Sequence, residues 1–266
     1  MKKTDYIAKK IATAIAIDGN IEKEVWQQAN WSKRFVDMVS GDVGMYNTQC
    51  AILWNDTYLY IAFRAEEPFV SATLTERDSI IFLENDLELF IEGKDCYYEL
   101  EANAANTLYE VFFIWKDAYI KTGRFDIPLF DVHQHKAYTF GGDYDRIGAS
   151  FWKGTHPRGI RWAFTNFDMP GLQTAVQVQG TLNDNSDVDQ GWSLELAIPW
   201  SSLKILDEER AVPPVSGDVW TMFLGRFQKF MPGGVEIVPH PAMALNCHGV
   251  YDTHLTEKWS SIVFEE

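Results

Sequence analysis

The stretch from Asp86 to Trp115 alternates apolar and polar residues with the period of two that is typical of β-strands. Its sequence is DLELFIEGKDCYYELEANAANTLYEVFFIW, and turns at Gly93-Lys94-Asp95 and Ala105-Asn106-Thr107 divide it into three short strands. Because successive side chains point to opposite faces, one face of this sheet is predicted to pack on a core. The other face carries acids, an amide and a ring: Asp86, Glu88, Tyr97, Glu99, Glu101 and Asn103.

The rest of the chain has the same character. A hairpin is expected over residues 51–65, and further strands are expected over 172–182, 192–198, 219–227 and 259–264. Helical passages are short, and there is no internal repeat and no linker rich in Ser, Gly or Pro. We therefore expect a single all-β domain over residues 1–266, folded as an antiparallel β-sandwich of jelly-roll or immunoglobulin-like type.

The regular alternation is lost between about residues 117 and 165. This insertion is rich in glycine, with Phe, Tyr and Trp interleaved. Loops of this length are usually functional or disordered, and the aromatic content argues against disorder. Trp152 and Trp162 have no core pattern to explain them, so we predict that they are platforms for a ligand, and Trp115 next to the insertion fits either role. Arg124 and Arg161 would bind ligand oxygens or form surface salt bridges.

Composition limits the partners. The net charge is −15, from 23 basic and 38 acidic residues, without a run of Lys or Arg, which argues against nucleic acid and anionic membranes. No stretch reaches the roughly 20 apolar residues that span a membrane. The first residues do not fit a signal peptide, so we expect a cytoplasmic protein, or an extracellular or periplasmic one if a signal has been removed. The three cysteines, Cys50, Cys96 and Cys247, are expected to be reduced.

The polar face of the three strands suggests carbohydrate binding. Acids and amides hydrogen-bond sugar hydroxyls, and flat rings pack on the apolar face of a pyranose. An ordinary solvated sheet face explains the same pattern equally well. The predicted ligand-binding residues are Glu99, Glu101, Asn103, Trp115, Arg124, Trp152 and Trp162.

An enzyme is the alternative. Glu99 and Glu101 lie two residues apart, hence about 6.6–6.8 Å between Cα atoms, and glycosidase carboxylates are roughly 5–9.5 Å apart. A glycosidase pair flanks the scissile bond, however, whereas these two acids approach from one side. No nucleophile elbow, P-loop or dinucleotide fingerprint is present either. Non-catalytic binding is favoured over a hydrolase that acts on O-glycosyl bonds.

Metal sites are suggested by three segments. Residues 183–189, NDNSDVD, place Asp184, Asp187 and Asp189 close together, as a structural calcium ion requires. The segment lacks the Gly and the distant Glu of an EF-hand, so an Asp/Asn-rich turn is the alternative. Gly142-Asp143-Tyr144-Asp145 is a weaker case. His133 and His135 have zinc-like spacing but no third ligand.

Six segments together resemble the family 9 carbohydrate-binding modules and the wider group of DOMON-like β-sandwiches. They occur in the order DGNIEKEVW (18–26), AILWNDTYLYIAF (51–63), NDLELFIE (85–92), YYELEANAANTLYEV (97–111), GTLNDNSDVDQGWSLELAIPW (180–200) and HLTEKWSSIVF (254–264). The resemblance covers nearly the whole chain and is nearest to the stand-alone bacterial version. It implies a non-catalytic glycan binder in polysaccharide degradation, with sugar held between two tryptophans and with structural calcium. Some DOMON-like relatives carry a redox cofactor or act as scaffolds instead.

The resemblance transfers only in part. Asn103 matches a sugar-binding amide of the family, but the family's sugar-binding arginine two residues earlier is Glu101 here. An acid also hydrogen-bonds sugar hydroxyls, so the change from arginine to Glu101 affects which sugar is expected to bind, and not whether a sugar binds. The two clamping tryptophans cannot be aligned. Six others lie in strand or turn patterns and are predicted to be core: Trp26, Trp54, Trp192, Trp200, Trp220 and Trp259.

Overall fold

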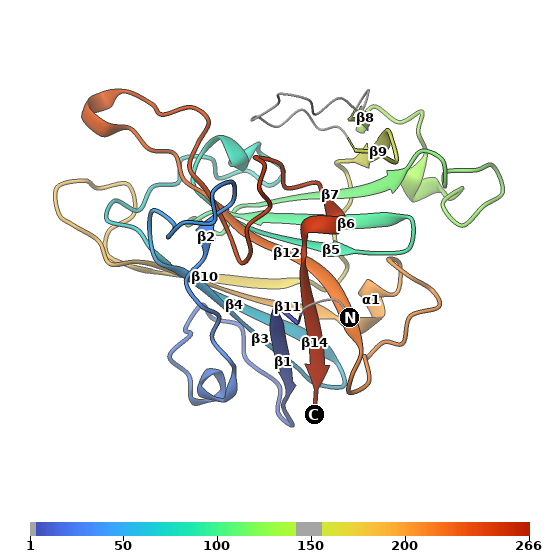
Figure 1. Cartoon of the computed structure of the whole chain (residues 1–266), viewed down its shortest axis with the longest axis horizontal. Coiled ribbons are helices and arrows are strands. Elements are labelled where there is room, and N and C mark those ends of the chain that lie inside the picture. The colour runs from blue at the N-terminus through green and yellow to red at the C-terminus, as the bar shows by residue number, and fades with distance from the viewer. Residues whose placement is uncertain (1–3, 142–155) are drawn as a thin grey trace.

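The computed structural model describes residues 4–141 and 156–266 and consists mainly of strands (Figure 1). The strands are β1 (Tyr6–Lys10), β2 (Val36–Asp37), β3 (Thr48–Trp54), β4 (Tyr58–Glu66), β5 (Asp86–Glu92), β6 (Cys96–Ala102), β7 (Leu108–Trp115), β8 (Ala137–Phe140), β9 (Arg161–Phe164), β10 (Gln173–Gln179), β11 (Gly191–Pro199), β12 (Val219–Phe227), β13 (Ala242–Ala244) and β14 (Ser260–Glu265). The helices are short: α1 (Trp200–Leu203) and the 3-10 turns η1 (Glu24–Gln28), η2 (Ile81–Leu83), η3 (Pro128–Phe130), η4 (Pro232–Gly234) and η5 (Thr256–Lys258).

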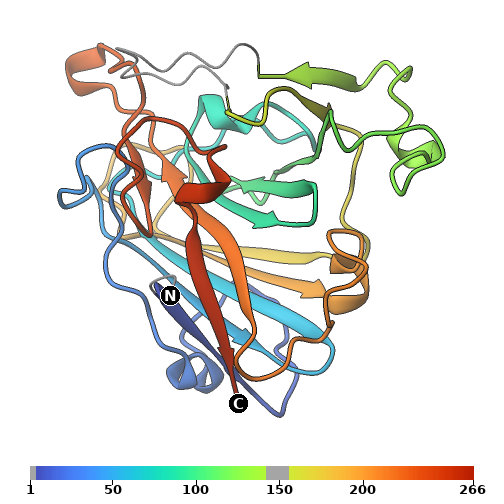
Figure 2. The same cartoon turned by 45° about the vertical axis from the view of Figure 1, so that its right-hand side comes forward.

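The strands pack as two layers (Figure 2). One layer runs β10-β11-β4-β3, the other runs β12-β5-β6-β7-β9-β8, and β1 with β14 connects them in one continuous hydrogen-bonded path. The predicted all-β sandwich is confirmed. Pairing is antiparallel except at β1, which runs parallel to both β14 and β3. β1 was not predicted, because its pairing partners β14 and β3 lie far along the chain.

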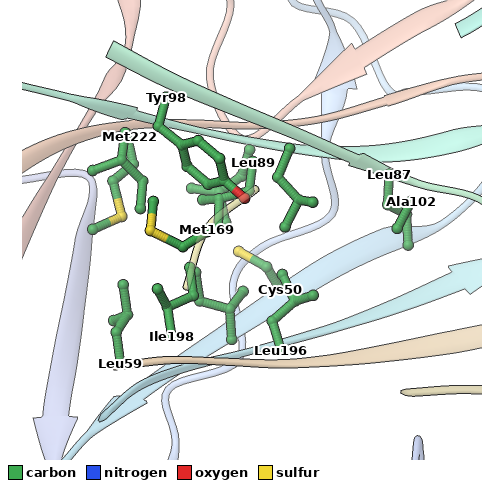
Figure 3. Packing of buried hydrophobic residues seen from close by; sticks show 14 of the residues in the cluster. Cys50, Leu59, Leu87, Leu89, Tyr98, Ala102, Met169, Leu196, Ile198 and Met222 are labelled. Carbon is green, nitrogen blue, oxygen red and sulfur yellow. The ribbon is translucent and has the colours of Figure 1, made fainter. Parts of the chain in front are cut away.

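The main core fills the space between the layers. Apolar side chains of β5 and β6 face those of β3, β4 and β11, and two methionines fill gaps between them (Figure 3). The labelled members are Cys50, Leu59, Leu87, Leu89, Tyr98, Ala102, Met169, Leu196, Ile198 and Met222. All six tryptophans predicted to be core are at most 4% exposed.

The three predicted strands over 86–115 are confirmed as β5, β6 and β7. Their turns contain Asp95 and Asn106 at positive φ (65° and 59°), a conformation that Asp and Asn tolerate better than other side chains. Gly93 is required in the first turn because a Cβ there would lie 2.4 Å from the carbonyl oxygen of Leu206. Local turn chemistry therefore sets the register of this meander.

In its described parts, residues 117–141 and 156–165, the predicted insertion consists largely of loops and contributes two strands. β9 pairs with β7 and β8 pairs with β9, which extends the sheet by two strands past β7. Both strands are only four residues long, too short for their alternation to stand out. Among the described residues, no helix is long and apolar enough to cross a membrane.

Candidate functional site

The predicted polar face of the meander exists, but it is buried. Asp86, Glu88, Glu99 and Glu101 are 0%, 3%, 4% and 2% exposed. In the strand register Glu88 lies opposite Glu101, and Phe90 lies opposite Glu99. The alternate residues of both strands belong to the sandwich core. The alternation thus predicted correctly which side chains of β5 and β6 face the core and which face away from it. Segments distant in sequence cover the face that carries the acids.

Burial and repulsion between neighbouring carboxylates have the largest effects on the pKa values of these acids. Burial raises the pKa of Asp86, Glu88 and Glu101 well above the ordinary range, and the neighbouring carboxylates raise it further. The pKa of Glu99 rises to about 8, again chiefly through burial, although Glu101 and Arg161 act in the opposite direction. Strongly shifted carboxyl groups in one cleft are typical of functional sites.

A pocket of about 640 Å³ opens over this face. Its size lies in the range of small-molecule sites. Three of the four acids line it, as do residues 251–254 near the C-terminus and His240. Aromatic rings from η2, β7 and β8 form much of the remaining lining: Phe82, Tyr109, Phe113, Tyr138 and Phe140.

A hydrogen-bonded chain supports one side of the pocket. The Nη1 of Arg161 donates to the Tyr97 hydroxyl at 3.0 Å, and that hydroxyl lies 2.9 Å from Nδ1 of His254. Burial and Arg161 lower the pKa of His254 well below its usual value, so its ring is neutral. We assign the hydroxyl as the donor to Nδ1, which leaves the proton on Nε2, 3.7 Å from Glu99 Oε2.

Two aromatic residues predicted to bind ligand support the fold instead. Trp115 is 4% exposed and is covered by Arg161, whose guanidinium lies 4.7 Å from its ring centroid. The side chain of Trp162 lies on the face of β9 opposite to that of Arg161. It packs against the main core, near Tyr119. Neither ring lines the pocket. Trp152 and the segment Gly142-Asp143-Tyr144-Asp145 lie outside the described residues.

Arg124 is also placed away from the pocket. Its guanidinium donates to the backbone carbonyls of Lys94, Ile205 and Leu206. It therefore ties the β5–β6 turn to the segment after α1, at the other end of the meander from Asn103. Of the residues predicted to bind ligand, the pocket gathers Glu99 and Glu101.

Asn103 completes the turn between β6 and β7. Its Oδ1 accepts the N–H groups of Ala105 (3.0 Å) and Thr107 (2.9 Å), and its Nδ2 donates to the carbonyl of Leu74 (2.9 Å). The side chain is fully buried. Its hydrogen-bonding capacity is thus largely used within the fold, and the residue does not line the pocket.

Asn103→Ala is expected to lower the free energy of unfolding by about 1–3 kcal/mol, because it removes three hydrogen bonds and leaves buried groups unpaired. Urea denaturation followed by circular dichroism measures this. Asn185→Ala in an exposed loop is the control and should stay within about 0.5 kcal/mol of wild type. An equal, negligible effect of both substitutions would show that Asn103 does not hold the turn.

The predicted calcium ligands of residues 183–189 do not converge. Both carboxylate oxygens of Asp189 accept backbone N–H groups, from Thr181 at 2.7 Å and from Val70 at 2.8 Å. Asp184 accepts the N–H of Ser186, and both Asp184 and Asp187 are exposed. An Asp-rich turn, the alternative interpretation, describes this loop. Within the described residues, neither this loop nor His133 and His135 forms a group of three metal ligands.

Such a group occurs instead on the pocket floor, where the alternation predicted a row of acids and no metal site. One oxygen from each of Asp86, Glu88 and Glu101 lies within 4.8 Å of the other two. We call these three residues the carboxylate trio. The pocket rings Phe82 and Tyr138 were also missed, because they lie in segments without periodicity.

Comparison with known proteins bears on the fold. No family model and no curated protein matches the sequence. A solved structure of a candidate carbohydrate-binding protein from Bacteroides uniformis ATCC 8492 has a TM-score of 0.58 at 13% identity, covering 97% of this chain and 98% of that one. A family 9 carbohydrate-binding module from Caldicellulosiruptor kristjanssonii, in complex with cellotriose, has a TM-score of 0.51 at 10% identity, covering 98% of this chain and 93% of the module.

The fold is that of family 9 carbohydrate-binding modules. The Caldicellulosiruptor module in complex with glucose has a TM-score of 0.50 at 11% identity, covering 97% of this chain and 95% of the module. These matches extend over the entire sandwich rather than over one sheet. At such low identities, the likeness to family 9 modules establishes architecture, and the chemistry of the pocket has to be argued from this chain's own residues.

Proposed function

We propose that this chain binds an oligosaccharide or polysaccharide, without catalysis, in the pocket over β5, β6 and β7. The observation that carries the proposal is the combination of carboxylates and aromatic rings around one open cavity of about 640 Å³. Sugars present hydroxyls at their edges and C–H groups on their faces, so they need both kinds of surface. The family 9 fold supports the proposal, since modules of that fold bind cellotriose and glucose.

Phe82 and Tyr138 are the proposed sugar platforms. They are 39% and 55% exposed, whereas Phe90 and Phe113, deeper in the pocket, are at most 3% exposed. Phe82 is held edge-on against Tyr109, with ring centroids 5.8 Å apart. A ring that is exposed and laterally supported can cover the apolar face of a sugar without rearrangement.

Polar groups near these rings would orient the sugar. Asp78 and Lys136 line the pocket, with 3.9 Å between Lys136 Nζ and Asp78 Oδ2. Glu88, Glu99 and Glu101 lie deeper. A protonated carboxyl group both donates to and accepts from sugar hydroxyls, so the deep acids can orient a sugar without carrying charge. Acids at two depths suit a ligand that enters the pocket with one residue and extends outward.

The placement of the acids supports a non-catalytic role. Glu88, Glu99 and Glu101 all project from the same face of two adjacent strands. A glycosidase needs carboxylates that flank the scissile bond. The test is incubation with cello-oligosaccharides, with product analysis beside affinity measurement: retention without released sugar supports binding, and released sugar supports the hydrolase alternative.

Tyr138→Ala and Phe82→Ala are each expected to weaken binding by about 1–2 kcal/mol, roughly 5–30-fold, because each removes an apolar surface from the bound sugar. Isothermal titration calorimetry with cellotriose measures the change. Phe69→Ala is the matched control, since Phe69 is 47% exposed and does not line the pocket. Wild-type affinity in both pocket variants would place the sugar elsewhere.

A further inference from the structure

The carboxylate trio has the span of a cation site. Asp86 and Glu88 lie on β5, and Glu101 lies on β6 directly opposite Glu88. One oxygen of each residue is within 4.8 Å of the others. Calcium binds oxygen at about 2.3–2.6 Å, so two ligands on opposite sides of the ion are about 4.8 Å apart. Rigid strands on a packed core hold the three side chains at this spacing.

The trio also contains oxygens without partners. Asp86 Oδ2, Glu88 Oε2 and Glu101 Oε2 are buried and make no hydrogen bond within residues 4–141 and 156–266. The other oxygen of Asp86 accepts the N–H of Phe227 at 3.1 Å. Buried polar atoms are almost always paired, so three such atoms in one cluster indicate that a further group binds at this point of the fold.

Buried acids away from the pocket, such as Glu110 and Glu67, are satisfied by protein groups. Glu110 accepts the Tyr98 hydroxyl and the N–H of Met169 and is paired with Arg77. Glu67 is paired with Arg226 and accepts the indole N–H of Trp192. The lack of partners is therefore a property of the pocket floor and not of buried carboxylates in this chain generally.

Arg226 acts electrostatically on Asp86 in the trio, but its effect on the pKa of Asp86 is smaller than the effect of burial. Within the described residues, no ion pair joins any of its members to Lys, Arg or His. Lys136 at the pocket pairs with Asp78, and Arg226 on β12 pairs with Glu67. Burying several carboxylates together is costly unless a cation is shared between them.

The donor set selects the kind of cation. All three ligands are carboxylates, without the nitrogen or sulfur that zinc prefers. Calcium accepts six to eight oxygens in flexible geometry, whereas magnesium requires a regular octahedron and loses its waters reluctantly. The trio supplies three to six oxygens, depending on how many carboxylates bind through both atoms. Glu88 and Glu101 line the pocket, so the remaining positions face its interior.

We propose that Asp86, Glu88 and Glu101 bind one calcium ion at the floor of the pocket, with its remaining coordination positions open to the cavity. Water or oxygens of a bound ligand complete the coordination. The ion neutralises the trio and fixes β5 to β6 through side chains as well as through the backbone ladder. This site is distinct from the Asp-rich loop 183–189, and it is independent of whether the pocket binds sugar.

The first experiment titrates CaCl2 into the chelator-treated full chain by isothermal calorimetry. We expect one site per chain, with MgCl2 binding at least tenfold more weakly. Glu101→Gln and Glu88→Gln should each weaken calcium binding at least tenfold, because each removes a charged ligand while keeping the shape of the side chain. Absence of calcium binding to wild type, or magnesium binding of equal affinity, would overturn the proposal.

Thermal unfolding gives a second readout. Calcium should raise the melting temperature of wild type relative to EDTA, since it binds the folded state. Glu101→Gln should lose this shift, and in EDTA it should melt no lower than wild type, because it relieves repulsion within the trio. The double variant Asp184→Asn/Asp187→Asn is the control and should keep the full shift. Loss of the shift in the loop variant but not in Glu101→Gln would assign calcium to the loop instead.

Discussion

Replacing Arg226 with methionine should lower the free energy of unfolding by about 3–5 kcal/mol, the usual cost of removing one partner of a buried ion pair. Arg226 is fully buried, and its Nη2 lies 3.1 Å from Glu67 Oε2. It also donates to Thr48 Oγ1, to the Glu66 carbonyl and to Gln228 Oε1. Burial lowers the pKa of Arg226 and raises that of Glu67, so each charge depends on the other.

The loss is expected because methionine leaves the Glu67 carboxylate buried without a cation. Urea denaturation of wild type, Arg226→Met and the double variant Glu67→Gln/Arg226→Met measures it. The double variant should recover part of the stability, because it no longer buries an unpaired charge. Lys94→Ala, which breaks an exposed pair with Glu209, is the control and should change stability by less than about 1 kcal/mol. An Arg226→Met variant as stable as wild type would contradict the role assigned to the pair.

Protonation of His248 should destabilise the fold as the pH falls from about 6.5 to about 4. Burial lowers the pKa of His248 from 6.5 to about 4, with Lys258 adding to the effect and the Asp252 carbonyl and Glu257 opposing it. Its Nδ1 donates to that carbonyl at 3.0 Å, and its Nε2 has no hydrogen-bond partner among the described residues. A proton on Nε2 would therefore be buried without an acceptor.

The direction and the size of this change in stability follow from the linkage between proton binding and folding. Between the two pKa values the unfolded chain binds the proton and the folded chain does not, so stability decreases as the pH falls. The difference between 6.5 and about 4 corresponds to about 3 kcal/mol, fully present above pH 6.5 and lost near pH 4. Denaturation of wild type and His248→Gln over this range isolates the contribution, because the buried carboxyl groups are common to both. Parallel stability curves for the two proteins would show that His248 does not titrate in this way.

Much of the candidate site could be predicted from local sequence. The alternation in β5 and β6 placed Glu99 and Glu101 on one face and Tyr98 and Leu100 on the core face, and both assignments are correct. The six core tryptophans were assigned on the same basis. These predictions succeed because the backbone of a pleated strand fixes its period of two. The face to which a side chain points therefore depends only on its position within the strand.

The positions of the predicted site residues that do not line the pocket have a different physical origin. In the sequence, Asn103 continues the alternation of β6. In the structure the strand ends at Ala102, and the Asn103 amide hydrogen-bonds within the turn that follows. Trp162 lacked a visible pattern because β9 is only four residues long. Arg124 and Trp115 are polar or aromatic groups whose partners, backbone carbonyls or Arg161, come from other segments. Each of these roles was decided by contacts that sequence spacing does not encode.

The sequence by itself determined the fold class, the meander with its turns, and which side of β5 and β6 carries the acids. Strand period and turn chemistry act over a few residues, so a short window contains all the information they need. The tertiary structure decided that the acidic face is covered, that Glu67 meets Arg226 across 159 positions, and that Tyr97 meets His254 across 157. Burial and pairing are properties of distant segments brought together, and they turn a row of acids into a pocket floor with a candidate cation site.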